Sequence, residues 1–345
     1  MGGGRDPILA VPAPGADPGA GRAGAARGPD PDGSRAAAPL PPPPERWTVL
    51  SMLLWSADYL AAKGVERARL DAEHLLAHAL GLRRLDLYLQ HDRPLEPEER
   101  EAFRPLLKRR AAREPLQYVL GRQPFRELDL VVDPRVLIPR PETEVLVGAV
   151  LERVGGWAAE GEERALEALD VGTGSGAIAL SLGREGPFAR VVATDASPEA
   201  LEVARINRAE AGLQDRVELR AGAGWDPLGT EERFDVVVSN PPYVAESERS
   251  ALQPEVVGWE PEGALFAGPD GLDVLRVLVA GAPDRLRGGG LLALEVGAGQ
   301  TRGVARMLEE DGRWVEITIG RDLAGKERIV TATRAHEHQD DLEEV

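Results

Sequence analysis

The sequence predicts an α/β protein. Its main part is a Rossmann-like domain with a mostly parallel seven-stranded sheet, preceded by a small helical bundle and a short β-hairpin-like connector. Three observations lead to this prediction. From Ala165 onward, short extended runs alternate with helical runs, as in a parallel sheet covered on both faces. Residues 46–113 show helical periodicity only. Residues 114–140 hold two short extended runs, "LQYVLG" and "LDLVVD", on either side of "RQPF".

Both ends of the chain are predicted to be disordered. Residues 1–45 are mostly Gly, Ala and Pro, and cannot bury enough apolar surface to offset their ordering entropy. Residues 335–345 form an acidic tail, and its two histidines fit a solvated tail better than a metal site. The leader lacks the apolar core of a signal peptide, and no apolar run approaches the ~18 residues of a membrane span. We therefore expect a cytoplasmic protein without membrane contact.

Composition narrows the classes of function. The 345 residues, 43% of them hydrophobic, can build two domains with sizeable cores. The sequence contains no cysteine, which excludes disulfides and thiolate metal sites. The formal net charge of −17 argues against a protein that binds nucleic acid directly through its phosphates. We expect a monomer that uses no metal.

The helical domain, residues 46–113, is slightly basic, whereas the rest of the chain is strongly acidic. Its helices are expected over residues 48–64, 69–81 and 96–115. The third helix ends in a basic cluster with two interpretations. It could be a docking surface for an acidic partner, or a solvated helix end whose bases complement the helix dipole. The cluster consists of Lys108, Arg109, Arg110 and Arg113.

The Rossmann-like domain is expected over residues 141–334. Its first helix opens with "PETE", a proline and two acids that suit a helix start. Strands are expected at 165–171, 189–195, 216–222, 234–240 and 289–297, with an antiparallel closing pair at 314–320 and 327–334. Helices are expected between them at 176–185, 197–212, 271–286 and 300–311.

A glycine-rich loop follows the first of these strands. Glycines there let the backbone turn tightly and approach a ligand at the usual binding edge of such a sheet. Three alternating glycines make an ordinary strand-to-helix turn improbable. Their spacing also fits the dinucleotide pattern G-x-G-x-x-G/A, so spacing alone leaves the cofactor open. The loop consists of Gly172, Thr173, Gly174, Ser175 and Gly176.

Two further residues fit a nucleoside cofactor. Asp195 ends the second strand, about twenty residues on, where a carboxylate can accept hydrogen bonds from both ribose hydroxyls. Nicotinamide and adenosylmethionine enzymes share this device. A helix cap is the weaker interpretation of Asp195, because Ser197 is the better cap. Trp225 could lie along an adenine ring, although a lone Trp there is more often surface or core.

The tetrapeptide Asn240-Pro241-Pro242-Tyr243 ends the fourth strand, since two prolines cannot continue a ladder. The Asn240 side-chain oxygen and the Pro241 carbonyl can accept the two hydrogens of a planar NH2 group and hold its nitrogen for in-line attack. Both acceptors bind more tightly as that nitrogen becomes cationic. Tyr243 offers a face for a flat group to stack on. The loop therefore suits methylation of an amide or aromatic amine, and a purely structural Pro-Pro turn is the alternative.

Several segments together resemble one known family, the peptide chain release factor glutamine methyltransferases, over about residues 47–333. These segments are "EPLQYVLG", "LIPRPETE", "LDVGTGSGAIAL", "VSNPPYV", "EVVGWEPEGALFAGPDGLDVLR" and "LEVGAGQ". The resemblance implies a class I methyltransferase domain behind a helical substrate-recognition domain. It implies S-adenosylmethionine as methyl donor, and as acceptor the glutamine of the Gly-Gly-Gln motif in class 1 release factors.

The resemblance also implies roles for residues. Residues at the cofactor would be Gly172 to Gly176, Asp195, Trp225 and Asn240. Asn240 to Tyr243 would hold the glutamine amide, with Asn240, Pro241 and Tyr243 as the catalytic group. The sequence departs from the family in its long leader, in its acidic tail and in "RQPFREL", which lacks a second aromatic after the Phe.

Three alternatives remain. The sibling family methylates a glutamine of a ribosomal protein, but "PRPETE" resembles the release factor branch more. Adenine amino-methyltransferases use the same kind of tetrapeptide on nucleic acid, but the acidic catalytic half and the lack of a basic recognition domain argue against them. A protein that only binds a partner would not need both an intact cofactor loop and an intact catalytic loop.

Overall fold

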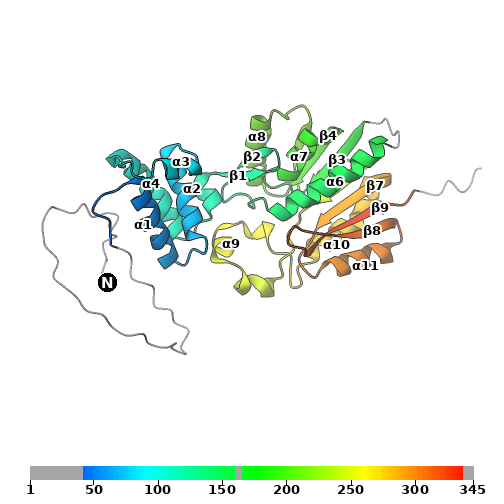
Figure 1. Cartoon of the computed structure of the whole chain (residues 1–345). Helices are drawn as coiled ribbons and strands as arrows, with labels where there is room; N and C mark the ends of the chain where they lie inside the picture. Colours follow the sequence, from blue (N-terminus) through cyan, green and yellow to red (C-terminus); the bar gives the residue numbers. More distant parts are fainter. Residues whose placement is uncertain (1–41, 160–164, 337–345) are drawn as a thin grey trace, which may run out of the picture. The chain divides into compact units, whose positions relative to one another are not determined.

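The computed structural model describes residues 42–159 and 165–336. The predicted leader lies outside them except for residues 42–45, and the predicted tail except for residues 335 and 336. The chain divides into two compact units, Met1–Leu120 and Gly121–Val345, here called the helical unit and the sheet unit (Figure 1). Among the described residues, every helix is too short or too polar to span a bilayer.

The helical unit packs its helices around one apolar core that includes Leu53, Leu75 and Phe103. Its first helix starts at a capping box, in which the Thr48 hydroxyl accepts from the Ser51 N–H and the Ser51 hydroxyl accepts from the Thr48 N–H. The helices are α1 (Val49–Ala62), α2 (Ala68–Leu80), α3 (Arg84–Leu89), α4 (Pro97–Ala111) and α5 (Leu116–Leu120).

The connector differs in part from the prediction. The run "LQYVL", expected to be extended, is helix α5, and its Tyr118 and Val119 are buried. Five residues are too few to separate a helical period from a strand period, so tertiary packing decides. The expected hairpin is present. Strand β1 (Arg122–Phe125) pairs antiparallel with β2 (Leu128–Val131). The two units divide between α5 and β1, inside the predicted connector.

The sheet unit holds the expected seven-stranded sheet in the order β5-β4-β3-β6-β7-β9-β8. Strands β3 to β7 are parallel, whereas β9 pairs antiparallel with both β7 and β8. The strands are β3 (Leu166–Val171), β4 (Phe188–Asp195), β5 (Val217–Ala221), β6 (Phe234–Ser239), β7 (Leu286–Glu295), β8 (Trp314–Arg321) and β9 (Glu327–Arg334).

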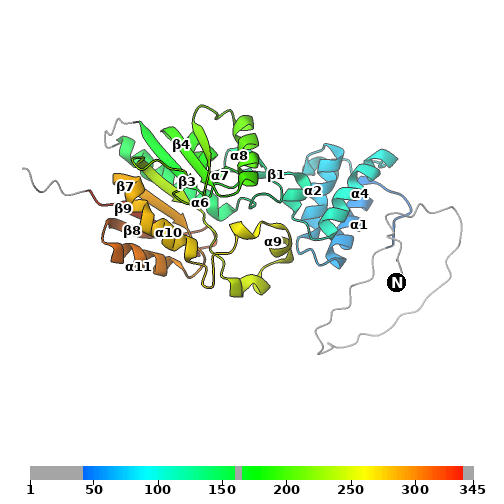
Figure 2. The ribbon, with the colours of Figure 1, turned by 180° about the vertical axis from the view of Figure 1, so that it is seen from behind.

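Helices cover both faces of this sheet. Leu146 and Val150 of α6 share one core with Ile178 of α7, and Leu278 of α10 shares the other with Leu308 of α11. Helix α8 starts at a Ser197 cap and contacts α7 and β5. Both views show α10 and α11 beside β7, β8 and β9 (Figure 2). The helices are α6 (Pro141–Ala159), α7 (Ala177–Glu185), α8 (Pro198–Ala211), α10 (Asp273–Gly281) and α11 (Thr301–Asp311).

The sheet reverses its strand order between β3 and β6. In open α/β sheets, ligands bind in the crevice at the carboxyl ends of the strands at such a point. The Ser239 hydroxyl donates to the Val171 carbonyl at 2.6 Å and ties these two strand ends together. The glycine loop leaves the end of β3, and Asn240 leaves the end of β6, so the fold brings both motifs to this edge.

A segment without sheet residues, residues 244–267, separates β6 from α10 and is called the wall segment below. It contains α9 (Pro254–Trp259) and two 3₁₀ turns, Glu246–Ala251 and Glu262–Ala264. Its ends meet in a bridge between Val244 and Phe266. No helix was expected here, because a six-residue helix between prolines carries little periodic signal.

Candidate active site

The glycine loop has the backbone shape that its sequence suggests. The φ angles of Gly172, Gly174 and Gly176 are 76°, 56° and 87°, in the left-handed region that glycine adopts without steric cost. A Cβ built at Gly172 or Gly174 meets nothing within 4 Å, so space lies open beside the loop. Conformation rather than crowding requires glycine at these two positions.

Asp195 holds this loop from the end of β4. One carboxylate oxygen accepts from the Gly174 N–H and the other from the Ser197 N–H, both at 2.8 Å. Burial raises the pKa of Asp195 above its ordinary value, and these two hydrogen bonds oppose the rise. Each oxygen keeps a further lone pair, so the carboxylate can still accept from a diol.

Asp170, at the end of β3, supports the loop from below. One of its oxygens accepts from the Thr173 hydroxyl at 2.6 Å and from the Ala179 N–H at 3.1 Å. Its other oxygen is buried and has no hydrogen-bond partner among the described residues. Burial raises the pKa of Asp170 to about 7. An open glycine loop and a half-buried acceptor at Asp195 fit a nucleoside with ribose hydroxyls, such as S-adenosylmethionine.

Trp225 packs on one face of the sheet, and α6 and α7 cover the other face. Its indole N–H donates to the Val277 carbonyl of α10 at 3.2 Å, and a Cβ at Gly281 would come 2.2 Å from the indole nitrogen. The ring therefore packs closely on α10 and joins the second core as a half-buried member. A role for Trp225 at an adenine ring remains a prediction.

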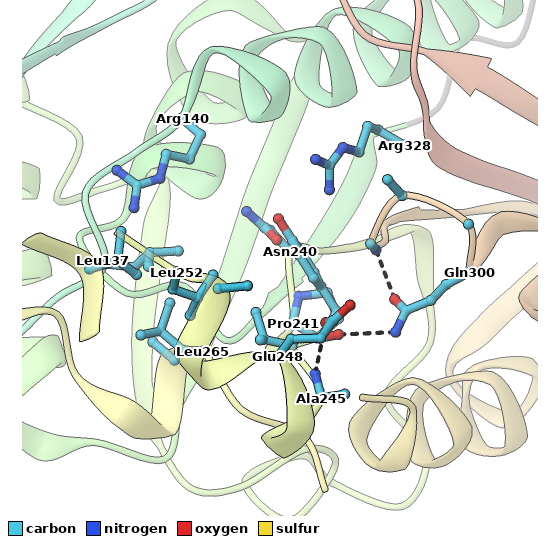
Figure 3. A pocket seen from close by; sticks show the side chains of 18 of the residues that line it. Leu137, Arg140, Asn240, Pro241, Ala245, Glu248, Leu252, Leu265, Gln300 and Arg328 are labelled. Carbon is cyan, nitrogen blue, oxygen red and sulfur yellow. Dashed lines mark hydrogen bonds between the residues drawn. The ribbon is translucent and has the colours of Figure 1, made fainter. Parts of the chain in front are cut away.

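A cavity of about 610 Å³ opens beside the Asn-Pro-Pro-Tyr loop (Figure 3). Asn240, Pro241 and Tyr243 line it, whereas the glycine loop and Asp195 do not. The wall segment contributes an apolar side that includes Leu252 and Leu265. The cavity therefore lies beside the tetrapeptide at the edge of the sheet that also carries the glycine loop and Asp195.

Asn240 is held through a chain of hydrogen bonds. Its Nδ2 donates to the Thr143 hydroxyl oxygen at 3.0 Å, and that hydroxyl donates to Glu295 Oε2 at 2.7 Å. The Tyr243 hydroxyl donates to the other Glu295 oxygen at 3.4 Å. Thr143 lies in the first turn of α6 and Glu295 at the end of β7, so three elements meet at Asn240.

Burial shifts both titratable groups of this chain. The Glu295 side chain is almost fully buried, and this raises its pKa to about 7, while the hydrogen bond from Thr143 opposes the rise. Burial also raises the pKa of the Tyr243 hydroxyl, and the charge of Glu295 raises it further. Tyr243 therefore stays protonated at neutral pH and acts as a donor.

Gln300 fixes the backbone of the tetrapeptide. Its Nε2 donates to the Tyr243 carbonyl at 3.0 Å, and its Oε1 accepts from the Gly297 N–H at 2.8 Å. Gly271 packs on the same place, because a Cβ there would lie 2.2 Å from the Tyr243 carbonyl oxygen. Two loops therefore clamp the turn that follows Asn240.

Two arginines face the cavity on either side of Asn240 (Figure 3). Arg140 forms an ion pair with Glu260, a residue of the wall segment that is 4% exposed. Glu260 also accepts from the Ile138 N–H at 3.3 Å, so it joins the start of α6 to the wall segment. The Arg328 guanidinium lies 6.0 Å from the centre of the Tyr243 ring.

The sequence predicted Asn240 and Tyr243 as site residues, and both line the cavity. It gave no such prediction for Thr143, Glu295 or Gln300. Glu295 gave one signal, since it is the lone acid in the buried run "LLALEV". The family segments "PRPETE" and "LEVGAGQ" contain all three missed residues, although the resemblance gave them no role.

Two family models match parts of this chain. A family model described as "PrmC N-terminal domain" matches residues 51–121, and one described as "Methyltransferase small domain" matches residues 159–257. The chain is similar to the release factor glutamine methyltransferase of Geobacter sulfurreducens, with 47% identity over 83% of this chain and 97% of that protein. The enzyme of the same name from Rhodopirellula baltica is 41% identical over 84% of this chain and 97% of its own.

Among solved structures, the hMettl16 catalytic domain in complex with MAT2A 3'UTR hairpin 1 is similar in fold, with a TM-score of 0.50 and 18% identity. The match covers 68% of this chain and 82% of that chain. It supports the Rossmann-like fold that the sequence predicts. With more than 40% identity to these relatives over most of its length, the chain belongs to the release factor glutamine methyltransferase family.

Proposed function

We propose that this chain transfers a methyl group from S-adenosylmethionine to the side-chain amide nitrogen of the glutamine in the Gly-Gly-Gln motif of class 1 peptide chain release factors. One observation carries the proposal. Asn240 lines a cavity with its Nδ2 bound to Thr143, which leaves Oδ1 to accept from an incoming amide. Membership of the release factor glutamine methyltransferase family supports the same acceptor.

The chain's residues would act mainly by positioning the amide. When bound, S-adenosylmethionine supplies an electrophilic methyl group on a sulfonium. Asn240 Oδ1 and the Pro241 carbonyl accept the two N–H groups of the glutamine and aim its nitrogen. Both acceptors bind more strongly as positive charge develops on that nitrogen, which lowers the barrier. The N-protonated product amide is strongly acidic, so it loses its proton to water once the product leaves the cavity.

The methyl donor would be held at the same edge of the sheet, beside the glycine loop and Asp195. The glycine loop gives close approach of backbone N–H groups, and Asp195 offers acceptors for ribose hydroxyls. The apolar side of the cavity, including Leu252 and Leu265, excludes water from the amide and strengthens the polar contacts there. Tyr243 presents its ring to the planar group.

Mass spectrometry tests this assignment. The full chain is incubated with a purified release factor and S-adenosylmethionine, and peptides that contain the Gly-Gly-Gln motif are examined for one added methyl. Asn240→Ala serves as the matched inactive variant, with an expected loss of about 10²–10³ in rate. Ribosomal proteins and an adenine-containing oligonucleotide are run beside the release factor. Methylation of either one in place of the release factor glutamine would overturn the proposal.

The same proposal extends to conditions and partners. We propose that the reaction needs no metal, because the sulfonium is already activated, and that the chain acts as a monomer in the cytoplasm, where release factors work. A net charge of −17 argues against direct nucleic-acid contact. Unchanged activity with a metal chelator and a monomeric mass in solution are the expected results.

A further inference from the structure

The Asn240 amide can work in one orientation only. Its oxygen accepts from a substrate N–H, whereas its NH2 end would repel the same group. The two ends have nearly the same shape, so packing alone hardly distinguishes them. Some partner outside the cavity must therefore select the orientation, and Thr143 is the side chain bonded to the far end of the amide.

The Thr143 hydroxyl has a single proton to give. Its oxygen lies 2.7 Å from Glu295 Oε2 and 3.0 Å from Asn240 Nδ2. An ionised carboxylate can only accept, so the Thr143 proton goes to Glu295. Toward Asn240 the hydroxyl is then left with lone pairs alone. It can accept from Nδ2, and it cannot stabilise the flipped amide.

We propose that Thr143 and Glu295 are positioning residues that hold the Asn240 amide with its oxygen toward the acceptor glutamine, an inference that rests on the proposed function. Thr143 is 3% exposed and Glu295 is 1% exposed, so water does not compete for these bonds. Neither residue touches the reacting atoms. They act through the orientation of the Asn240 amide, and ionised Glu295 is the form that selects the working orientation.

Protonation of Glu295 allows the hydrogen bonds between Glu295, Thr143 and Asn240 to reverse their direction. A neutral carboxyl can donate to Thr143, and Thr143 can then donate to Asn240 Oδ1, which favours the flipped amide. The groups that face Glu295 come from three elements. Glu142 of α6 raises its pKa, whereas Arg328 of β9 and the Tyr243 hydroxyl lower it. Burial brings the pKa of Glu295 to about 7, so turnover should fall as pH decreases through the neutral range.

Thr143→Val removes the hydroxyl and keeps the shape of the side chain. We expect kcat at saturating donor to fall about 10- to 100-fold, because the amide loses its selected orientation. Donor affinity measured by calorimetry should stay the same, which also shows that the variant is folded. Thr143→Ser restores the hydroxyl and should recover most of the lost turnover.

The pH profile separates a positioning role from a structural one. Only kcat at saturating donor is compared, because Asp170 has a pKa near the same value on the donor side. The wild type should lose turnover below neutral pH. Thr143→Val and Glu295→Gln should lose this acid dependence. Glu142→Gln removes a negative charge beside Glu295, so it should shift the acid limb to lower pH and leave the plateau unchanged.

The outcomes are distinct. Wild-type turnover in folded Thr143→Val, or the same acid limb in Thr143→Val and in the wild type, overturns the positioning role alone. A wild-type enzyme that leaves the release factor glutamine unmethylated overturns the proposed function, and the inference with it.

Discussion

Asp195 shows how one side chain can organise a loop and still remain open to a ligand. Both of its oxygens accept a backbone N–H, one from the glycine loop and one from the turn before α8. These bonds fix the carboxylate without using all of its lone pairs. Its role is therefore expected in donor binding, separate from the amide chemistry at Asn240.

Asp195→Ala should weaken S-adenosylmethionine binding and leave turnover at saturating donor largely intact. The ribose would lose its acceptors, and the Gly174 N–H would lose its partner. Calorimetry with the donor measures the affinity. Asp195→Asn is the control. It keeps one acceptor oxygen, so its donor affinity should lie between those of the wild type and Asp195→Ala. Equal affinities in all three proteins would place the ribose partner elsewhere.

At the residue scale, sequence reasoning found the groups at strand ends and missed those that reach them from elsewhere. Asn240 could be predicted, because two prolines mark the end of a buried strand. Thr143 lies 97 positions from Asn240, and Glu295 lies 152 positions from Thr143. Such contacts exist only after α6 and β7 have packed, and no local pattern encodes them.

Among the elements, the turn after β6 depends on two neighbouring loops. Gly271 has a φ of 73° and sits against the Tyr243 carbonyl, while Gln300 donates to that same oxygen. The tetrapeptide therefore has little freedom to move without displacing a neighbour. The rigidity that the two prolines supply within the turn is continued by packing from outside it.

Gly271→Ala should lower kcat, whereas a variant with the same backbone cost but no contact at the site should keep the wild-type kcat. An added Cβ would lie 2.2 Å from the Tyr243 carbonyl oxygen and must displace the turn that carries Asn240. Gly325→Ala is the matched control. Its φ is 77°, it meets nothing within 4 Å, and it lies in the β8–β9 turn. Both variants should lose roughly 1–2 kcal/mol from the backbone conformation. If turnover falls equally in both, the contact with Tyr243 has no functional role.

Helix α4 gives the basic cluster a structural explanation in large part. Arg110 Nε pairs with Asp71 Oδ2 at 2.7 Å, and both side chains are less than a tenth exposed. Arg109 pairs with Glu114, and Arg113 donates to the Gly64 carbonyl. These arginines join α4 to other parts of the helical unit, so reversing their charges would disturb the fold before it tested docking.

Asp71→Ala should therefore destabilise the helical unit by about 3–5 kcal/mol, because it removes the carboxylate that pairs with the buried Arg110 guanidinium. Lys108→Ala, on the same helix and half-buried, should change stability by only about 0.5 kcal/mol. Chemical denaturation followed by circular dichroism measures both. A variant at Asp71 as stable as the one at Lys108 would refute the buried ion pair as a structural element.

Element prediction succeeded where the residue types favour one structure and failed where a short run carries no such preference. The runs "FDVVVSN" and "RVVATD" are rich in β-branched residues, and both are buried strands. Helices α3, α5 and α9 have six, five and six residues, less than two turns each, so tertiary contacts rather than periodicity determine them. The wall segment was missed for this reason.

Considered as a whole, the sheet unit separates the candidate active site from its largest network of ion pairs. The site occupies the carboxyl ends, whereas an ion-pair network lies near the amino ends of β3, β4, β6 and β7 and is reached by the Arg220 side chain from β5. In that network Glu232 pairs with Arg220 at 2.7 Å and with Arg190 at 2.8 Å. Arg287 pairs with Asp235 and with Glu167, each at 2.7 Å. The network joins neighbouring strands, and its residues do not line the cavity beside Asn240.

Glu232 makes this network sensitive to acid. The hydrogen bonds from Arg220, the largest cause, help lower its pKa from 4.5 to about 2. A carboxyl with a depressed folded-state pKa contributes stability above its unfolded pKa and loses it as pH falls toward the folded value. Glu232→Gln should therefore reduce the free energy of unfolding near neutral pH, and the difference from wild type should shrink between pH 4.5 and about 2.

Glu231→Gln is the control for this measurement, because it changes the charge by the same amount at the exposed neighbouring position. Denaturation curves over a series of pH values would show the effect. A difference for Glu232→Gln that stays constant down to pH 2, or one that Glu231→Gln reproduces, would contradict a specific role for the ion pairs.

The wall segment has a consequence for how this enzyme can change. Residues 244–267 supply the apolar side of the cavity from one uninterrupted stretch of chain, while the donor-side residues come from the ends of β3 and β4. Its two ends meet at Val244 and Phe266, so a stretch of different length can leave and rejoin the fold at the same place. We therefore expect that exchange of this stretch would change which acceptor group the cavity admits, while the glycine loop and Asp195 keep their places.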